Sequence, residues 1–94
     1  IGSLELDIQT RTIYQASKKL KRLSKLEFSL LKLLYSHKGD IVSYEKIEEL
    51  WEDAIMNEHS LYNYIVKLRK ILAADPDISI STIGGNGYML LAPM

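Results

Sequence analysis

One segment of the chain has two distinct faces when it is folded as a helix. Between His59 and Leu72 there is no acidic residue, although 12 of the 94 residues are acidic. At about 100° per residue, apolar side chains form one stripe, which comprises Leu61, Ile65, Leu68 and Leu72. The opposite side comprises His59, Asn63, Val66, Lys67 and Lys70. The pattern predicts a helix that buries the apolar stripe and exposes the other side.

An exposed side of this kind suits the major groove of DNA, because the groove admits a helix and its walls carry phosphate. An ordinary amphipathic helix with a solvated basic face explains the same pattern. The segment alone leaves both interpretations open, so the rest of the chain has to decide between them.

The chain as a whole is short and has an ordinary globular composition. At 94 residues we expect one domain, which buries about 60–65% of the surface of the unfolded chain. Hydrophobic residues at 47% and charged residues at 26% argue against disorder. The lack of cysteine excludes disulfides and thiolate metal sites. Neither a signal peptide nor an apolar run of about 18–20 residues is visible. Because the chain begins at Ile1 rather than methionine, we expect a fragment of a longer protein.

Charge is distributed unevenly, although the formal net charge is zero. Residues 11–38 carry eight basic residues and one acidic residue, whereas residues 45–58 carry six acidic residues and one basic residue. The zero net charge therefore conceals a polarised surface, and the field that a partner meets depends on the face presented to it.

The first part of the chain predicts a small antiparallel sheet. Alternating apolar and acidic residues between Leu4 and Ile8 indicate a half-buried strand, and residues 12–14 indicate a second one. Residues 19–23 suggest a third, although Leu20 and Leu23 do not alternate strictly. Such a sheet cannot stand alone, so it needs a helix on which to pack.

That helix is predicted to begin at Ser24, which forms a capping box with Glu27. It is apolar on two sides, so we expect it to lie between the sheet and the later helices, with its leucines and Tyr35 in the core. Gly39 fits a C-terminal stop.

Two further helices and a hairpin are predicted to follow. Ser43 caps a helix that runs from residue 44 to about Trp51, a residue we expect in the core. After a loop at 52–57, the two-faced helix runs from about residue 58 to residue 73 or 74. A turn, a strand, a glycine-rich tip and a return strand then occupy residues 75–77, 78–83, 84–87 and 88–91.

This order of elements predicts a single α+β domain of the winged helix-turn-helix class, spanning residues 1–94. Its parts are an N-terminal antiparallel β-sheet at 1–23, a three-helix core at 24–74 and a C-terminal β-hairpin wing at 78–91. The sheet and the first two helices would fix the third helix, and the hairpin would lie beside that helix as a second contact surface.

Several motifs together resemble the C-terminal effector domain of the OmpR/PhoB family of bacterial response regulators. Residues 23–31, LSKLEFSLL, are similar to the family's LTxxEFxLL, and Gly39, Val42-Ser43 and Glu45 match its G-x-x-V-S-R-E region. Trp51 stands at the family's tryptophan. Residues 65–72, IVKLRKIL, are similar to IxRLRKKL, and residues 83–88, IGGNGY, are similar to VRGxGY. Each motif alone is weak, but their joint occurrence over nearly the whole chain is specific.

The resemblance implies a cytoplasmic bacterial transcription regulator of a two-component phosphorelay. It also implies a four-stranded N-terminal sheet, an upstream receiver domain, and binding to direct-repeat promoter DNA, usually as head-to-tail dimers. The loop between the second and third helices would contact RNA polymerase through Glu52, Asp53, Ile55 and Asn57. For the acidic stretch 45–58 as a whole, a solvated face that repels DNA is the simpler interpretation, and an activator surface is the alternative.

Carried over position by position, the resemblance also implies the DNA contacts. The third helix would contribute His59, Ser60, Tyr62, Asn63, Val66, Lys67, Arg69 and Lys70, and the wing would contribute Gly84, Gly85, Asn86 and Gly87. Asn63, Val66 and Lys67 would face bases, with Tyr62 at the groove edge. Ser60, Arg69 and Lys70 would contact or approach phosphate.

The chain departs from the family pattern at several of these positions. His59 replaces an arginine, and Tyr62 replaces an aspartate. Gly84 replaces the wing arginine that enters the minor groove, and Met89 replaces an arginine after the last tyrosine. A wing without arginine gains nothing from the negative potential of a narrow minor groove.

We therefore expect weak DNA binding by the isolated domain and a shallow dependence on salt. Each lost phosphate contact removes about 0.9 from the log–log slope, and a slope steeper than about −6 would contradict this expectation. The basic stretch with Lys18, Lys19, Lys21 and Arg22 offers compensation, but we expect the fold to direct it away from DNA.

Other functions have less support in the sequence. His37 and His59 lack metal-ligand spacing, no nucleophile is paired with a base, and the cluster 84–87 is explained as a turn, so we expect no catalysis, cofactor or metal. The alternative to DNA binding is a protein-interaction winged helix, which the neutral charge, the wing without arginine and the tyrosines Tyr44, Tyr62 and Tyr64 would suit.

Overall fold

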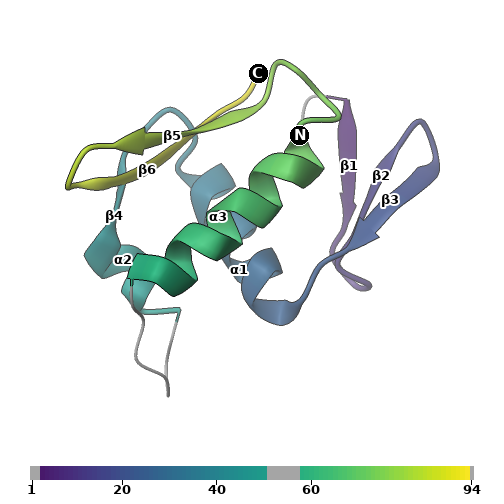
Figure 1. The fold of residues 1–94 in the computed structure, drawn as a ribbon. Helices are drawn as coiled ribbons and strands as arrows, with labels where there is room; N and C mark the ends of the chain where they lie inside the picture. Colours follow the sequence, from purple (N-terminus) through teal and green to yellow (C-terminus); the bar gives the residue numbers. More distant parts are fainter. Residues whose placement is uncertain (1–2, 51–57, 94) are drawn as a thin grey trace.

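The computed structural model describes residues 3–50 and 58–93, and for Glu58 and His59 it describes the backbone alone. The elements in these parts of the chain are β1 (Leu4–Asp7), β2 (Thr12–Gln15), β3 (Lys18–Arg22), α1 (Lys25–Ser36), β4 (Val42–Ser43), α2 (Tyr44–Glu48), α3 (Glu58–Leu72), β5 (Ser79–Ile83) and β6 (Gly87–Leu91). In Figure 1, α3 crosses the middle of the domain between the β5–β6 hairpin and the N-terminal strands. The predicted α+β winged helix-turn-helix is confirmed.

The N-terminal sheet is antiparallel, in the order β1-β2-β3. Its register shifts between β2 and β3, because Ile13 pairs with Lys21 while Tyr14 pairs with Lys19. Leu20 is therefore an extra residue on β3, which is a β-bulge. The bulge explains why Leu20 and Leu23 do not alternate as a regular strand would require.

The second sheet has the order β4-β6-β5 and contains the C-terminal hairpin. The expectation of four strands in the N-terminal sheet is wrong for the described residues, where that sheet has three. The remaining short strand, β4, pairs with β6 instead, with Val42 opposite Tyr88 and Ser43 opposite Gly87. The hairpin is thus anchored to the chain between α1 and α2.

Helix α1 begins with the predicted capping box. The Ser24 hydroxyl accepts from the Glu27 backbone N–H at 3.2 Å, and the Glu27 carboxylate accepts from the Ser24 N–H at 2.8 Å. The helix ends at Ser36, and Gly39 follows at φ +84°, donating its N–H to the carbonyl of Leu90 at 2.9 Å. Tyr35 was expected in the core, but 38% of its surface is exposed. It lies outside the side of α1 formed by the three fully buried leucines, and Lys38 covers its ring instead, with Nζ 5.3 Å from the centroid.

Helix α2 is shorter than predicted. Ser43 caps it as expected, accepting from the Lys46 N–H at 3.2 Å, but the helix ends at Glu48. Trp51 and the predicted loop at 52–57 lie outside the described residues. Ile47 is the fully buried residue of this helix.

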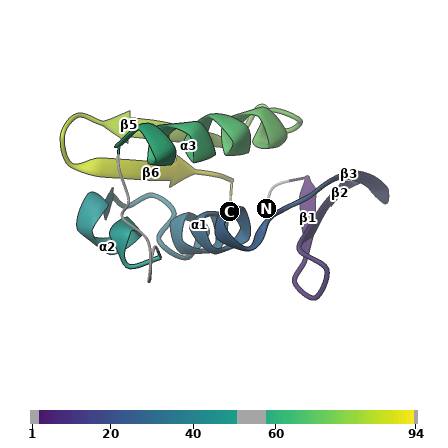
Figure 2. The ribbon, with the colours of Figure 1, turned by 60° about the horizontal axis from the view of Figure 1, so that its bottom comes forward.

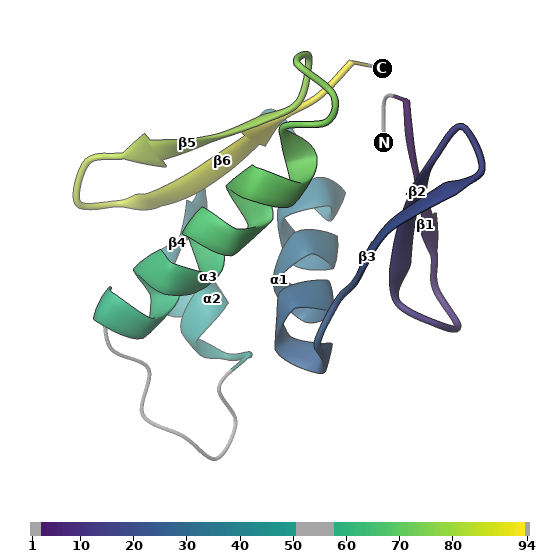
Figure 3. The same cartoon turned by 45° about the vertical axis from the view of Figure 1, so that its right-hand side comes forward.

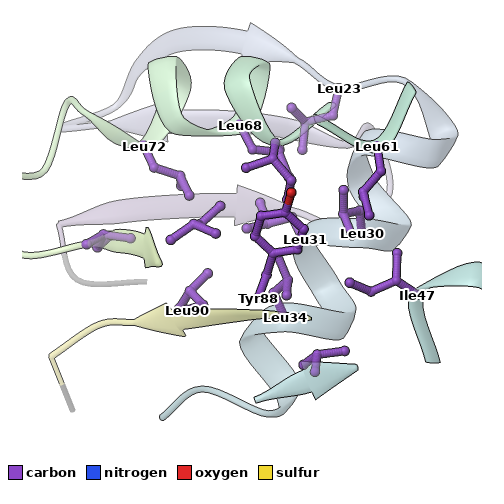
Figure 4. Close-up of a cluster of buried hydrophobic side chains, with 14 of the residues drawn as sticks. Leu23, Leu30, Leu31, Leu34, Ile47, Leu61, Leu68, Leu72, Tyr88 and Leu90 are labelled. Carbon is purple, nitrogen blue, oxygen red and sulfur yellow. The ribbon is translucent and has the colours of Figure 1, made fainter. Parts of the chain in front are cut away.

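One hydrophobic core joins the three helices to both sheets. Figure 4 shows Leu30, Leu31 and Leu34 of α1 facing the apolar stripe of α3 and the β6 side chains Tyr88 and Leu90. Figure 3 shows α1 and α3 side by side, with the N-terminal sheet beyond α1. Truncating a buried leucine to alanine typically costs about 2–5 kcal/mol, so this core holds α3 in place.

Candidate nucleic-acid interface

Helix α3 has the two faces that its sequence predicts. Its apolar stripe is buried, with at most 1% of each side chain exposed at Leu61, Ile65, Leu68 and Leu72. On the other side, Tyr62 is 54% exposed, Asn63, Lys67 and Lys70 are exposed, and Ser60 and Val66 are half-buried. The His59 side chain lies outside the described part of the chain. The hairpin therefore leaves the predicted base-contacting side of α3 open to solvent.

Arg69 points at the hairpin, away from this open side. Its Nε and Nη2 donate to the carbonyl oxygen of Ile80 at 3.0 and 2.8 Å, and Nη2 also donates to the Thr82 hydroxyl at 3.0 Å. Arg69 was predicted to contact phosphate, but its guanidinium is already engaged in fastening β5 to α3. The sequence could not show this, because it does not reveal which strand lies beside that flank of the helix.

Lys67 lies against an aromatic ring of its own helix. Its Nζ is 5.4 Å from the centroid of Tyr64, three positions earlier, a geometry that allows a cation–π interaction. The ammonium is thereby held over the flank of α3 that carries Tyr64.

The wing tip combines exposed and buried residues. Gly84, Gly85 and Asn86 are exposed, and Gly85 has φ +73°. Gly87 was predicted as a wing contact, but it is buried, and a Cβ atom there would overlap the carbonyl oxygen of Val42. Its role is to let β6 approach β4 closely. The Asn86 carbonyl accepts from the Tyr44 N–H at 3.2 Å, which ties the tip to the start of α2.

A hollow of about 490 Å³ between the wing tip, α2 and α3 is lined by Tyr44, Tyr62, Gly85 and Tyr88. Tyr44 and Tyr88 meet edge to face, with ring centroids 5.9 Å apart. Tyr64, by contrast, lies under Lys67. The three tyrosines that suited a protein interface in the sequence therefore do not form one patch: Tyr44 and Tyr62 share this hollow, and Tyr64 lies elsewhere on α3.

A second open hollow, of about 480 Å³, lies between β3 and the carboxyl-terminal half of α3. It is lined by Leu20, Lys21, Lys67, Lys70, Ile71 and Ala74. The basic N-terminal stretch was expected to point away from the DNA-facing side, but Lys21 lies in the same hollow as Lys67 and Lys70. The broken alternation at Leu20 was the sequence signal for this, because a bulge turns successive side chains toward one side.

A hydrogen-bond cluster fastens the N-terminal sheet to the end of α3. The Asp75 carboxylate accepts from the N–H and the hydroxyl of Ser3, at 2.7 and 2.9 Å, and from the Asp77 N–H at 2.9 Å. The hydrogen bond from the Ser3 backbone, followed by that from Asp77, holds the pKa of Asp75 below its ordinary value. Gln15 adds a bond from Nε2 to the Ala74 carbonyl at 3.0 Å. The residue pattern at 75–77 predicts a turn but not this contact with Ser3, which lies 72 positions away.

Within residues 3–50 and 58–93, no group of histidine, aspartate and glutamate side chains is placed to hold a metal ion. No helix in the described ranges is long and apolar enough to cross a membrane.

Known proteins resemble this chain in both sequence and fold. The family described as "Transcriptional regulatory protein, C terminal" matches residues 17–90. Transcriptional regulatory protein RprY of Bacteroides fragilis is 36% identical over 95 residues, which cover 99% of this chain and 40% of that protein. This chain thus spans less than half of that relative.

Two solved structures extend the comparison. Response regulator DrrB of Thermotoga maritima, an OmpR/PhoB homologue, is 29% identical with a TM-score of 0.77, covering 99% of this chain and 43% of that one. The RstA DNA-binding domain of Klebsiella pneumoniae, crystallised with the RstA box, is 26% identical with a TM-score of 0.75, covering 99% of this chain and 94% of that one.

Proposed function

Because the chain belongs to the OmpR/PhoB-type family of C-terminal domains of transcriptional regulatory proteins, we propose that it binds double-stranded DNA sequence-specifically, with α3 in the major groove. One observation carries this proposal. The 15-residue helix α3 exposes Asn63, Lys67 and Lys70 on a side that has no acid between residues 59 and 72.

The exposed side chains have the chemistry that base reading requires. The Asn63 amide can pair with N6 and N7 of adenine, Lys67 can donate to O6 and N7 of guanine, and Val66 can touch a thymine methyl group. Each good base contact contributes about 1–3 kcal/mol of discrimination. Ser60 and Lys70 would contact phosphate, with Tyr62 at the groove edge. Lys67 has to leave the Tyr64 ring before it can reach a base.

The longer protein would use this domain as its output. We propose an upstream receiver domain, head-to-tail pairing on direct repeats, and an RNA polymerase contact through the segment that contains Glu52 and Asp53. Reversing both charges should abolish transcription and leave DNA binding intact. Loss of both functions together would count against the polymerase contact.

Selection of bound sequences from a random DNA pool tests the central proposal. The domain should enrich a defined motif, and fluorescence anisotropy should show tighter binding to that duplex than to an unrelated duplex of equal length. Asn63→Ala should lose the preference at one base position, whereas Lys32→Gln, on the exposed side of α1, should keep it. Equal affinity for both duplexes would refute sequence-specific binding.

A protein-binding winged helix is the second candidate. The hollow beside the wing favours it, because Tyr62 is 54% exposed there and tyrosine is enriched at protein interfaces. Failure of the domain to bind any duplex at low salt would support this candidate over DNA binding.

A further inference from the structure

The two flanks of α3 differ in charge. The hairpin lies along one flank, and residues 71–94 contain no lysine or arginine. The nearest cation of α3 on that side, Arg69, is turned onto β5. On the other flank, beside only the carboxyl-terminal half of α3, lies β3, whose five residues are all exposed and include Lys18, Lys19, Lys21 and Arg22. Figure 2 shows the wing tip and β3 beyond opposite ends of α3.

The hollow between β3 and α3 brings lysines from both elements together. Lys21 of β3 and Lys67 and Lys70 of α3 line it, with Leu20, Ile71 and Ala74 as the apolar residues between them. No acidic side chain is among these lining residues. The aliphatic stems of the lysines can cover the apolar part while their ammonium groups stay in water. Three like charges around one open hollow repel each other, and a bound anion would relieve that repulsion.

Several hydrogen bonds hold β3 in its position beside α3. The Leu23 N–H donates to the Arg11 carbonyl at 2.7 Å, and the Asp75–Ser3 and Gln15–Ala74 bonds join the sheet to the end of α3. A surface that is already in place loses little conformational entropy when it binds.

We propose that β3 is a second DNA-backbone surface, with Lys21 as its central phosphate contact on the flank of α3 opposite the hairpin. This inference rests on the proposed function, because it takes α3 to lie in the major groove. A helix in that groove has a phosphate backbone along each side. In this domain, the hairpin brings no cation to one backbone, while β3 places Lys21 beside Lys67 and Lys70 on the side of the other. On this proposal, Lys21 adds to the phosphate contacts that α3 makes through Lys70.

The salt dependence of DNA affinity tests this surface. The 94-residue domain, Lys21→Gln and Lys32→Gln are titrated by anisotropy against the selected duplex and an unrelated duplex at several salt concentrations. Lys21→Gln should make the log–log slope shallower by about 0.9 on both duplexes, so its affinity should fall about eightfold less than the wild-type affinity for each tenfold increase in salt. Lys32→Gln removes the same charge from a remote part of α1 and should leave the slope unchanged. Circular dichroism melting checks that each variant is folded.

The outcomes separate this inference from the proposed function. If Asn63→Ala loses the preference for the selected duplex while Lys21→Gln keeps the wild-type slope, the β3 surface is refuted and base reading by α3 stands. If Lys32→Gln changes the slope as much as Lys21→Gln, the effect is one of net charge and the inference is also refuted. If the wild-type domain binds neither duplex, both ideas are wrong.

Discussion

The two sheets on either side of α3 are built for different tasks. The hairpin sheet β4-β6-β5 has no cation of its own, and Arg69 and the Gly39 N–H join it to the rest of the domain. Within the sheet, Gly87 lets β6 approach β4 closely. The N-terminal sheet is joined at its edge by Asp75, and its third strand is exposed and basic. A cation on the hairpin side therefore serves stability, whereas a cation on the β3 side is available to a ligand.

Glycine substitutions on the hairpin side should have the largest effect. Gly87→Ala places a Cβ atom 2.8 Å from the Val42 carbonyl carbon and 2.9 Å from the Ser43 Cα, so β4 and β6 have to separate. Because the obstructing atoms are backbone, we expect a loss of about 3 kcal/mol or more in the free energy of unfolding, at the upper end of overpacking costs. Gly84→Ala is the matched control, since nothing lies within 4 Å of its Cβ position. Urea unfolding measures both, and equal stabilities would contradict the close packing.

Arg69 and Lys21 offer a direct contrast between the two flanks. Arg69→Gln removes charge-assisted hydrogen bonds to Ile80 and Thr82, so we expect a loss of about 1.5–3 kcal/mol in stability. Lys21→Gln should change stability by no more than about 0.5 kcal/mol, as is usual for an exposed side chain. The salt slope of DNA binding should respond in the opposite way, with no change in slope for Arg69→Gln among molecules that remain folded. A shallower slope for Arg69→Gln would mean that this side chain does reach phosphate.

The contact that fastens the N-terminal sheet should depend on pH. The pKa of Asp75 is lowered from its ordinary 3.8, chiefly by the Ser3 backbone N–H, so the folded state favours the carboxylate. This stabilisation is fully present above the ordinary pKa and is lost as the pH falls from there through the lower pKa of the folded state. Asp75→Asn should therefore show a smaller loss of stability between pH 5 and pH 3 than the wild-type domain, measured by urea unfolding. Parallel pH profiles for the two proteins would show that the Asp75 contact contributes no pH dependence.

The sequence predicted those features of the domain that depend only on residues close together in the chain. The Ser24–Glu27 capping box and the two faces of α3 depend on residues within one or two helical turns of each other, so their spacing suffices. The roles of Arg69, Gly87 and Asp75 depend on partners that lie beside them only after folding. The family resemblance implied that Arg69 contacts or approaches phosphate, and no local pattern revealed its bonds to Ile80 and Thr82. The Asp75–Ser3 bond joins residues 72 positions apart. The bulge at Leu20 is an intermediate example. Its irregular spacing is visible locally in the sequence, but the resulting position of Lys21 beside Lys67 depends on the tertiary fold.

The Lys67–Tyr64 contact should have the smallest effect on the free energy of unfolding. It also bears on whether Lys67 contacts a base or a phosphate. An exposed cation–π pair contributes about 0.5–1 kcal/mol, so a double-mutant cycle with Lys67→Ala and Tyr64→Leu should give a coupling near the lower end of that range. If α3 reads bases as proposed, the same contact would oppose that reading, because Lys67 would have to leave the ring to reach a guanine but not to reach a phosphate beside β3. Tyr64→Leu should therefore strengthen binding to the selected duplex slightly if Lys67 contacts a base, since the competing contact is gone. If Lys67 instead stays over the flank and contacts phosphate, Tyr64→Leu should leave the preference between selected and unrelated duplexes unchanged, and anisotropy titrations of that single variant distinguish the two roles.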